Sequence, residues 1–479
     1  MSLLSSNKGE LMEPIIKNAG ALLSDGDSES RRIVLELTQM TLARLNACER
    51  IKSVLHRDGA VLRIGEKTWD LSKKRHVYLI GAGKACNAMA MAVEQVLGEY
   101  LTDGIAIVKI AEPSDHFEKT RVFVGGHPIP NEAGLHASEE ILRMIDQACG
   151  EDLFLCVMSG GSSALMSAPT EGLTLEDEIQ TTDVLLKSGA NIREINAIRR
   201  HISRMNGGRM AQRIAEKGAE LIGFNISDSV SNGPTGDISV PWPNYQGTPM
   251  GPDFTTIADA LAVIRNYDLA DRLPPRVIEY LTHCGPGDET PKAFPQNTYY
   301  QINTLPDSCV YAEQAARQMG IPALVLTTYL EGEASDAGRF MAAVARQIQN
   351  YGQPIQPPCF VLSAGEVVTT IPDSSCIRGH GGPSQEMVLG FAEQAVGAPG
   401  ACLLSIDSEG TDGTTMAAGG IADSKTLPSV KMQGLDLYRA LREHSSFEIL
   451  SAVGGSVVTG NTGTNVCDIN IMYVPEKGQ

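Results

Sequence analysis

The segment HVYLIGAGKACNAMAMAVEQVLG, residues 76–98, decides the fold of the first half of this chain. An apolar run at residues 77–80 stops at Gly81 and Gly83, and helical spacing follows. A strand that enters a helix through a glycine-rich turn is typical of dinucleotide-binding units. Here Lys84 follows the second glycine, and the third glycine position of the NAD pattern holds Cys86. The turn therefore fits either NAD or a phosphate group that Lys84 contacts.

Beyond this segment, short apolar runs alternate with helical patterns, which predicts a parallel α/β sheet with crossover helices. The second half holds more paired strand-like runs and fewer helices, which predicts a mixed sheet there. Residues 274–297 have the composition of a linker, so the predicted domains are residues 1–290 and 291–479. The strands predicted in the first domain cover residues 77–80, 105–110, 122–124, 153–158 and 220–224, and the helices 86–97 and 133–148.

Length and charge narrow the class of protein. A chain of 479 residues is too long for one ordinary core. Its 39 basic and 57 acidic residues give a net charge of -18, which repels nucleic acid and anionic membranes. An anionic substrate would therefore need a local concentration of lysine and arginine, which makes basic clusters informative.

The ten cysteines form no C-x-x-C pair and have no zinc-type spacing with histidine, which favours a reducing compartment. No apolar stretch approaches the roughly 18–20 residues of a membrane span. The first residues lack the apolar core of a signal peptide. The sequence therefore predicts a cytoplasmic protein without a membrane partner.

A second strand runs into a glycine loop in LFLCVMSGGSSALMSAP, residues 153–169. The loop does not fit the G-x-S-x-G pattern of serine hydrolases. Its N–H and O–H groups are donors for phosphate or carboxylate oxygens, although a serine here also suits a helix cap. The loop residues are Ser159, Gly160, Gly161, Ser162 and Ser163.

The segment GANIREINAIRRHISRMNGGRMAQRI, residues 189–214, concentrates positive charge. At 100° per residue one helical face carries Arg193, Asn196, Arg200 and Arg204, and isoleucines lie opposite. Arg199 lies at the edge of the apolar stripe, so we expect it to be partly buried. Arginine suits bidentate contacts with carboxylate and phosphate, although an isolated cluster of this kind is usually a solvated face.

Acidic residues follow several apolar runs directly. Asp228 and Glu366 each close such a run, and Asp407 does the same before Glu409 and Asp412 in a glycine-rich loop. Single Asp-Gly turns are ordinary surface loops. Ligands of open α/β sheets bind outside the carboxyl ends of strands, where carboxylates can carry Mg²⁺ for phosphoryl transfer.

Taken in order along the chain, these segments resemble the class II glycerate 2-kinases, whose C-terminal part is a MOFRL-type domain. The resemblance covers roughly residues 30–475. The motifs that carry it are GAGKA, GGHPIPNEAGLHAS, SGGSSAL, INAIRRHISRMNGGRMA, ISDSVSNGPTGD, AGEVVTTI, GGPSQE, EGTDGTTMAAGGIAD and VTGNTGTNVCDI.

The resemblance implies a large Rossmann-like α/β/α domain, residues 1–290, and a smaller C-terminal α/β domain with a mixed sheet, residues 291–479. The active site would lie in the cleft between them. The implied reaction is ATP-dependent phosphorylation of D-glycerate at the 2-hydroxyl to give 2-phospho-D-glycerate, with Mg²⁺, and a homodimer is the candidate assembly.

The resemblance also assigns residues. Its catalytic set is Lys84, Arg200, His380 and Asp228, and its magnesium set is Asp412, Glu366 and Asp407. Substrate or phosphate would be bound by Gly81, Gly83, Ser159, Gly160, Gly161, Ser162, Ser163, Asn196 and Arg199. The nucleotide would be bound by Arg378, Gly381, Gly382, Gln385, Glu409, Gly410, Thr411 and Gly413.

Three positions depart from the family's pattern. Ser162 replaces the third glycine of S-G-G-G-S, and Ser384 replaces an asparagine. His380 stands where an arginine commonly precedes the paired glycines, and Arg378 can supply the charge from two residues upstream. The alternatives are a kinase for a related 2-hydroxy acid, an NAD(P)H-dependent hydroxypyruvate reductase, and a ligand sensor without catalysis.

Overall fold

The computed structural model describes residues 14–478 apart from 231, 243–248, 295–296 and 372–373. The chain forms two compact units. The N-terminal unit comprises Leu45–Asp307 and Gly463–Val466. The C-terminal unit comprises the described residues up to Arg44, Ser308–Thr462, and the described residues from Cys467 onward.

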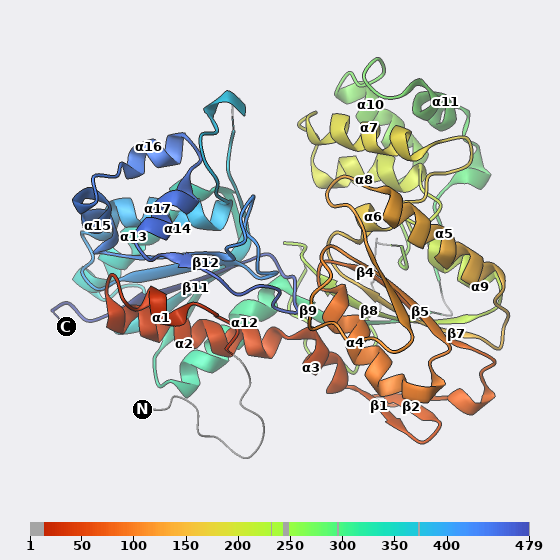
Figure 1. The fold of residues 1–479 in the computed structure, drawn as a ribbon, viewed down its shortest axis with the longest axis horizontal. Coiled ribbons are helices and arrows are strands. Elements are labelled where there is room, and N and C mark those ends of the chain that lie inside the picture. The colour runs from red at the N-terminus through yellow and green to blue at the C-terminus, as the bar shows by residue number, and fades with distance from the viewer. Residues whose placement is uncertain (1–13, 231, 243–248, 295–296, 372–373, 479) are drawn as a thin grey trace. The chain divides into compact units, whose positions relative to one another are not determined.

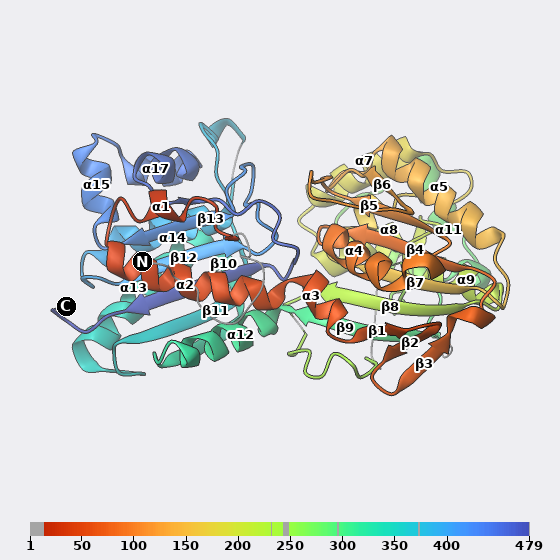
Figure 2. The ribbon, with the colours of Figure 1, turned by 60° about the horizontal axis from the view of Figure 1, so that its bottom comes forward.

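The N-terminal unit is built on a six-stranded parallel sheet in the order β6-β5-β4-β7-β8-β9 (Figure 2). Numbered from the first strand of the sheet, this is the 3-2-1-4-5-6 order of Rossmann folds. The predicted parallel sheet with crossover helices is confirmed. Its strands are β4 (Val77–Gly83), β5 (Asp103–Val108), β6 (Thr120–Val124), β7 (Leu153–Met158), β8 (Glu220–Ser227) and β9 (Thr298–Thr304).

Helices cover both faces of this sheet because its strands are apolar on both sides. On one face, α5 (Glu132–Asp146) and α9 (Arg209–Glu216) share a buried core with β4, β5 and β7. On the other face, α4 (Cys86–Leu97) packs on β4 and β5 and contacts α3 (Ala47–Lys52). A small antiparallel sheet joins β1 (Leu55–Asp58), β2 (Val61–Ile64) and β3 (Lys67–Asp70).

Four helices form a separate apolar cluster in the same unit. Thr174, Asn191 and Thr256 begin three of them with capping boxes, which satisfy the free N–H groups of each first turn. The four are α7 (Leu175–Leu186), α8 (Ile192–His201), α10 (Ile257–Asn266) and α11 (Pro275–His283); the short α6 (Ser162–Leu165), η1 (Leu71–Lys73), η2 (Gly98–Tyr100) and η3 (Pro286–Asp288) complete the unit.

The C-terminal unit has a six-stranded sheet in the order β10-β11-β15-β12-β13-β14. The pair β10–β11 is parallel and the other pairs are antiparallel, so the predicted mixed sheet is confirmed. The strands are β10 (Ala323–Glu333), β11 (Cys359–Val368), β12 (Cys402–Asp407), β13 (Gly419–Asp423), β14 (Ser456–Val457) and β15 (Asp468–Val474).

The helices α13 (Ala334–Tyr351) and α14 (Pro383–Ala395) lie side by side against this sheet (Figure 1). They approach closely because Gly338 and Gly390 face the other helix's backbone, where a Cβ atom would lie 1.9 Å from Met387 O and 2.1 Å from Ser335 O. The remaining elements are α1 (Ala19–Leu22), α2 (Ser28–Leu45), α12 (Leu305–Gln318), η4 (Ser374–Cys376), α15 (Thr426–Met432), α16 (Leu437–Arg442) and α17 (Ser446–Ala452).

The units divide the chain differently from the predicted domains, residues 1–290 and 291–479. Strand β9 adds to the parallel sheet, so the N-terminal unit continues to Asp307. The segment 274–297, which the sequence suggested as a linker, contains α11 and η3. Helix α2 belongs mainly to the C-terminal unit, where buried Arg31 pairs with buried Asp423 at 2.6 Å.

Candidate active site

Two glycine loops of the N-terminal unit lie at the ends of β4 and β7. These neighbouring parallel strands pair from Val77 with Leu153 to Ala82 with Met158. The strand order reverses between them, and ligands of open α/β sheets bind at such a switch point. The Lys84 N–H donates to Gly160 O at 2.9 Å, and the Ser159 N–H donates to Ala82 O at 3.1 Å. The structure therefore brings the two predicted anion loops together.

Helix α4 begins at Cys86, two residues after Lys84, and has no side-chain cap, in contrast to α7, α8 and α10. The Ser159 hydroxyl accepts the Ala85 N–H at 3.0 Å, so this serine serves α4 and does not cap α6. An uncapped helix start carries partial positive charge, which favours an anion. Gly81 is required for packing, because a Cβ atom there would lie 2.6 Å from Cys86 Sγ.

The two glycines of the second loop permit close approach of other chain segments. A Cβ atom on Gly160 would lie 1.7 Å from Asp228 Oδ2 and 2.5 Å from Asn465 Nδ2. Gly161 has a φ of +86° and sits under the Lys84 stem, whose Cγ would be 3.3 Å from a Cβ atom. The same Cβ atom would lie 3.0 Å from the His127 ring. The loop is thus enclosed by Lys84, His127, Asp228 and Asn465.

His127 and Asn465 were not among the predicted site residues. Asn465 is buried, and its amide lies 3.4 Å from Asp228 Oδ2 although the two residues are 237 positions apart. Both lie in motifs that carried the family resemblance, GGHPIPNEAGLHAS and VTGNTGTNVCDI. The motifs were a signal, but the sequence did not show which of their side chains reach the loop.

The structure separates the arginines of α8. Arg200 Nη1 lies 2.8 Å from Asp253 Oδ1, and this fully buried carboxylate also accepts hydrogen bonds from Thr255 and Thr290. Burial alone would raise the pKa of Asp253, but Arg200 and these hydrogen bonds lower it. Arg200 is therefore held by a structural partner inside the unit.

Arg199 differs from its neighbour. Its Nε and Nη2 atoms are buried and have no hydrogen-bond partner. Burial lowers its pKa, the nearby Glu178 carboxylate opposes that change, and Arg200 adds to it. Buried Glu178 accepts the Ser167 hydroxyl at 2.6 Å, and burial raises the pKa of Glu178. Arg199 thus has buried donors that no partner uses, and it is partly buried, as expected from the sequence.

Three other residues of the predicted arginine face also have defined positions. Arg193 is exposed and Asn196 is half-buried on α8. Helix α8 ends at His201, so Arg204 lies beyond the helix and does not share its face. Arg204 Nε donates to Pro169 O at 2.8 Å, and Arg204 lines a pocket of about 320 Å³ together with Arg209 and Arg213.

The C-terminal unit gathers four carboxylates at one edge of its sheet. Asp407 ends β12 opposite Asp468, and Glu366 lies near the end of β11. Buried Asp412 accepts hydrogen bonds from the N–H groups of Ser384 and Gln385 and from the Gln385 amide. Asp468 was not among the predicted site residues.

Burial and mutual repulsion perturb these carboxylates. Burial raises the pKa of Asp412 to about 6 against the opposing hydrogen bonds from Gln385 and Ser384. Burial also raises the pKa of Asp468 well above its usual value, and the charges of Asp407, Asp412 and Glu366 contribute. In the part of the chain that the structure describes, no three His, Cys, Asp or Glu side chains are arranged to hold a metal ion.

The predicted nucleotide loops of the C-terminal unit pack on each other. The Thr414 N–H donates to Gly381 O at 3.0 Å, and a Cβ atom on Gly413 would lie 2.1 Å from that oxygen. Gly382 faces the Asp412 carboxylate, which a Cβ atom would approach to 2.3 Å. The Thr411 hydroxyl donates to Glu409 at 2.9 Å, and Gly410 has a φ of +101°. The structure thus joins Gly381, Gly382, Gln385, Asp412 and Gly413 in one cluster.

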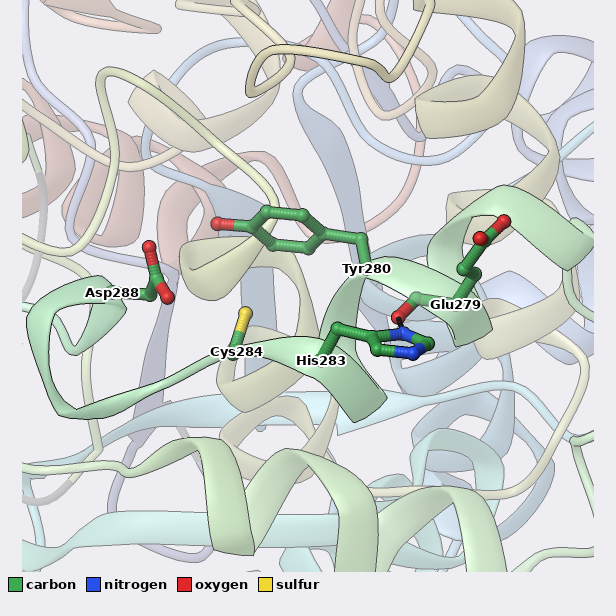
Figure 3. Close-up of a pocket in the computed structure, with 5 residues that line it drawn as sticks. All are labelled: Glu279, Tyr280, His283, Cys284 and Asp288. Carbon is green, nitrogen blue, oxygen red and sulfur yellow. Dashed lines mark hydrogen bonds between the residues drawn. The ribbon is translucent and has the colours of Figure 1, made fainter.

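A separate pocket of about 220 Å³ lies on α11 and η3 (Figure 3). The Nδ1–H group of His283 donates a hydrogen bond to Glu279 O at 2.7 Å. None of the predicted site residues lines this pocket. Its lining residues are Glu279, Tyr280, His283, Cys284 and Asp288.

None of the helices in the described parts of the chain has both the length and the apolar character needed to cross a membrane. The fold and the loops define a two-unit α/β protein of the Rossmann type with glycine-rich turns at its switch point. Residues 33–282 match a family described as a domain of unknown function, DUF4147, and residues 359–468 match the MOFRL family.

Three known proteins are similar to this chain over most of its length. A glycerate 2-kinase of Pyrococcus horikoshii is 38% identical over 84% of this chain and 88% of its own length. A crystal structure of glycerate kinase from Thermotoga maritima superimposes with a TM-score of 0.75 at 29% identity, over 94% of this chain and 100% of that one. A relative from Agrobacterium vitis, 34% identical over 83% of this chain and 86% of its own, is provisionally named a hydroxypyruvate reductase. This chain belongs to the glycerate kinase family.

Proposed function

We propose that this protein is an ATP-dependent glycerate 2-kinase, which transfers the γ-phosphoryl group of ATP to the 2-hydroxyl of D-glycerate and forms 2-phospho-D-glycerate. The observation that carries the proposal is the pair of glycine loops around Lys84, at the switch point of a Rossmann-type sheet. The similarity to glycerate kinases over most of the chain supports it.

Phosphoryl transfer depends on positioning and on cations that stabilise charge spread over the phosphoryl oxygens. Lys84 stabilises that charge in our proposal, and the uncapped start of α4 adds N–H donors. The loop from Ser159 to Ser163 donates hydrogen bonds to substrate oxygens, with Gly81 and Gly83 allowing its close approach. Asp228 orients the acceptor hydroxyl, and Asn465 holds Asp228.

The arginines of α8 take unequal parts in the proposal. Arg199 binds an anionic group of the substrate, with Asn196 beside it on the helix, because its Nε and Nη2 donors are unused. Arg200 keeps the helix in place through Asp253. The catalytic role that the sequence suggested for Arg200 is therefore replaced by a positioning role in this proposal.

In the C-terminal unit, His380 and Arg378 supply further positive charge to phosphate oxygens. The nucleotide is bound by Gly381, Gly382, Gln385, Gly413 and the loop of Glu409, Gly410 and Thr411. Asp407 and Glu366 are the proposed Mg²⁺ ligands, and the carboxylate repulsion around Asp468 is what a divalent cation would relieve. Mg²⁺ would neutralise phosphate charge there. Asp412, which already accepts three N–H groups, orders the loop.

The proposal is tested by ADP release with a panel of 2-hydroxy acids, followed by phosphorus NMR of the product. D-glycerate with a phosphate at the 2-position is the expected result. Replacing Lys84 by alanine should lower turnover by at least about 10²-fold, as for loss of one donor to a developing oxyanion. Near-normal turnover of that variant would remove Lys84 from the mechanism.

The competing reductase activity has its own readout. It requires binding of NAD(P)H, which quenches or shifts nicotinamide fluorescence, and it consumes no ATP. Cys86 occupies the third glycine position of the dinucleotide pattern, which counts against binding of NAD(P)H. We further propose a cytoplasmic location, no nucleic-acid partner and a homodimer, the last to be tested by light scattering.

A further inference from the structure

Within the C-terminal unit, the Glu448 carboxylate contacts both the backbone N–H and the imidazole ring of His380. The carboxylate accepts the His380 backbone N–H at 3.0 and 3.1 Å and lies 2.9 Å from His380 Nδ1. The Phe447 N–H in turn donates to His380 O at 3.0 Å. A side chain that is 67% exposed is therefore attached through its own backbone and ring to the first turn of α17.

The residues beside His380 allow this attachment. A Cβ atom on Gly379 would lie 2.4 Å from Ser445 Cβ and 2.7 Å from Glu448 Oε2, and one on Gly381 would lie 2.1 Å from Ser446 Oγ. Glycine at both positions lets the loop close on α17. The loop is also held by the Arg378 N–H, which donates to Glu443 O at 2.8 Å.

The other charged groups near this loop have partners of their own. Glu443, at the end of α16, pairs with Arg439 at 2.9 Å. His444 Nδ1 lies 2.9 Å from the largely buried Glu386 of α14. Asp412, from the loop before β13, accepts the N–H groups of Ser384 and Gln385.

Arg378 is exposed in the loop itself. From the loop between β12 and β13, the Thr414 N–H donates to Gly381 O. Among the described residues, Glu448 is thus the charged side chain within hydrogen-bonding distance of the imidazole. Burial opposes ionisation of Glu448, but hydrogen bonds from the side chain and backbone of His380 outweigh it and lower the pKa of Glu448.

The ionised carboxylate decides which ring nitrogen of His380 carries a proton. An ionised carboxylate only accepts hydrogen bonds, so Nδ1 must hold a proton to donate to Glu448. A neutral imidazole then has no proton on Nε2, and the lone pair of Nε2 would face a phosphate oxygen, which is also an acceptor. Nε2 becomes a donor to phosphate when the ring is doubly protonated and positively charged.

We infer that Glu448 is a positioning residue that fixes His380 with Nδ1 inward, so that His380 binds phosphate as an imidazolium through Nε2. The inference rests on the proposed kinase function. It makes the reaction depend on pH at this position, because an imidazole can lose its charge whereas an arginine keeps it.

The experiment compares kcat/KM for ATP between the wild type and His380→Arg from about pH 6 to about pH 8, by ADP release. The arginine variant keeps a planar cation at every pH. The ratio of wild type to variant should fall as the pH rises, because only the charged ring donates to phosphate through Nε2. A constant ratio would overturn the inference.

A rise of wild-type activity with pH, together with an inactive His380→Arg, would also overturn the inference, because it would make His380 a general base. A second readout separates the inference from the kinase proposal. Nitrogen-15 NMR of labelled histidine, with the signal assigned by its loss in His380→Arg, reports the tautomer directly. At about pH 8 we expect the Nδ1–H form in the wild type and gain of the Nε2–H form in Glu448→Gln. An Nε2–H form in the wild type refutes the positioning role of Glu448 even if the kinase assay succeeds. Absence of ADP release with the Nδ1–H form present refutes the kinase proposal alone.

Discussion

Replacing Gly160 by alanine should disable the site while leaving the fold largely intact. The added methyl group would stand 1.7 Å from Asp228 Oδ2 and 2.5 Å from Asn465 Nδ2. Gly160 has no positive φ, so the substitution brings no backbone strain. The obstructing atoms are the ends of two side chains, which can rotate away. The expected consequence is therefore displacement of Asp228 from the loop.

The size of the effect follows from that displacement. Non-bonded heavy atoms are most favourably about 3.5 Å apart, so Asp228 Oδ2 must move by about 2 Å. A misplacement of about 1 Å in a catalytic arrangement can cost on the order of 10²-fold in rate. We expect kcat/KM to fall by at least about 10²-fold, while overpacking lowers the free energy of unfolding by about 1–3 kcal/mol.

The assay is ADP release at saturating ATP with varied D-glycerate, alongside urea unfolding of each variant. Gly287→Ala is the matched control, because nothing lies within 4 Å of a Cβ atom at Gly287 in the same unit. A double-mutant cycle with Asp228→Ala isolates the cause. If Gly160→Ala acts by displacing Asp228, then adding Asp228→Ala should cost little more.

Two results would refute the reasoning. A folded Gly160→Ala variant with activity within about threefold of the wild type would show that the position of Asp228 does not limit the reaction. Full additivity of the two substitutions would show that they act through separate routes.

Two further predictions concern the C-terminal unit. Arg31→Met leaves the buried Asp423 carboxylate without its ion pair, so the free energy of unfolding should fall by about 3–5 kcal/mol in urea titrations. Arg31→Met combined with Asp423→Leu should recover part of the lost stability. A single variant as stable as the wild type would contradict the importance of this ion pair. Because burial raises the pKa of Asp412 to about 6, the fold favours the protonated form, so this group stabilises the protein at low pH and the contribution is lost as pH rises through about 6. Between about pH 4 and pH 7, without divalent cations, the free energy of unfolding of the wild type should fall by roughly 3 kcal/mol more than that of Asp412→Asn, and parallel pH profiles would refute the shift.

Much of the fold could be predicted because its signals are local. An apolar run, a glycine turn and a helical period occur within about twenty consecutive residues, and helix α4 begins and ends at the predicted residues, Cys86 and Leu97. The boundary between the units was harder to predict from the sequence. Strand β9 has the same local pattern as strands of the other sheet, and its pairing with β8 depends on residues far away in the chain.

In the candidate site, too, local features could be predicted from the sequence and long-range contacts could not. Lys84 and the serine loop could be predicted as candidates because backbone N–H groups at a helix start, with a cation beside them, suit an anion. The contact between Gly160 and Asn465, and the choice of Asp253 as the partner of Arg200, could not be read from spacing. Arg199 and Arg200 are adjacent in the sequence, but in the structure Asp253 pairs with Arg200, whereas the buried Nε and Nη2 of Arg199 have no partner.

The sequence by itself determined the strand-turn-helix units, the acidic background and the loops that suit an anion, because each depends on a short run of residue types. The tertiary structure decided which loops are neighbours, which arginine is held by a carboxylate, and which side chains of distant motifs reach Gly160. The physical reason is that strand order, register and burial are set by contacts between residues far apart in the chain, and hydrophobic periodicity fixes which face is buried but not what it is buried against.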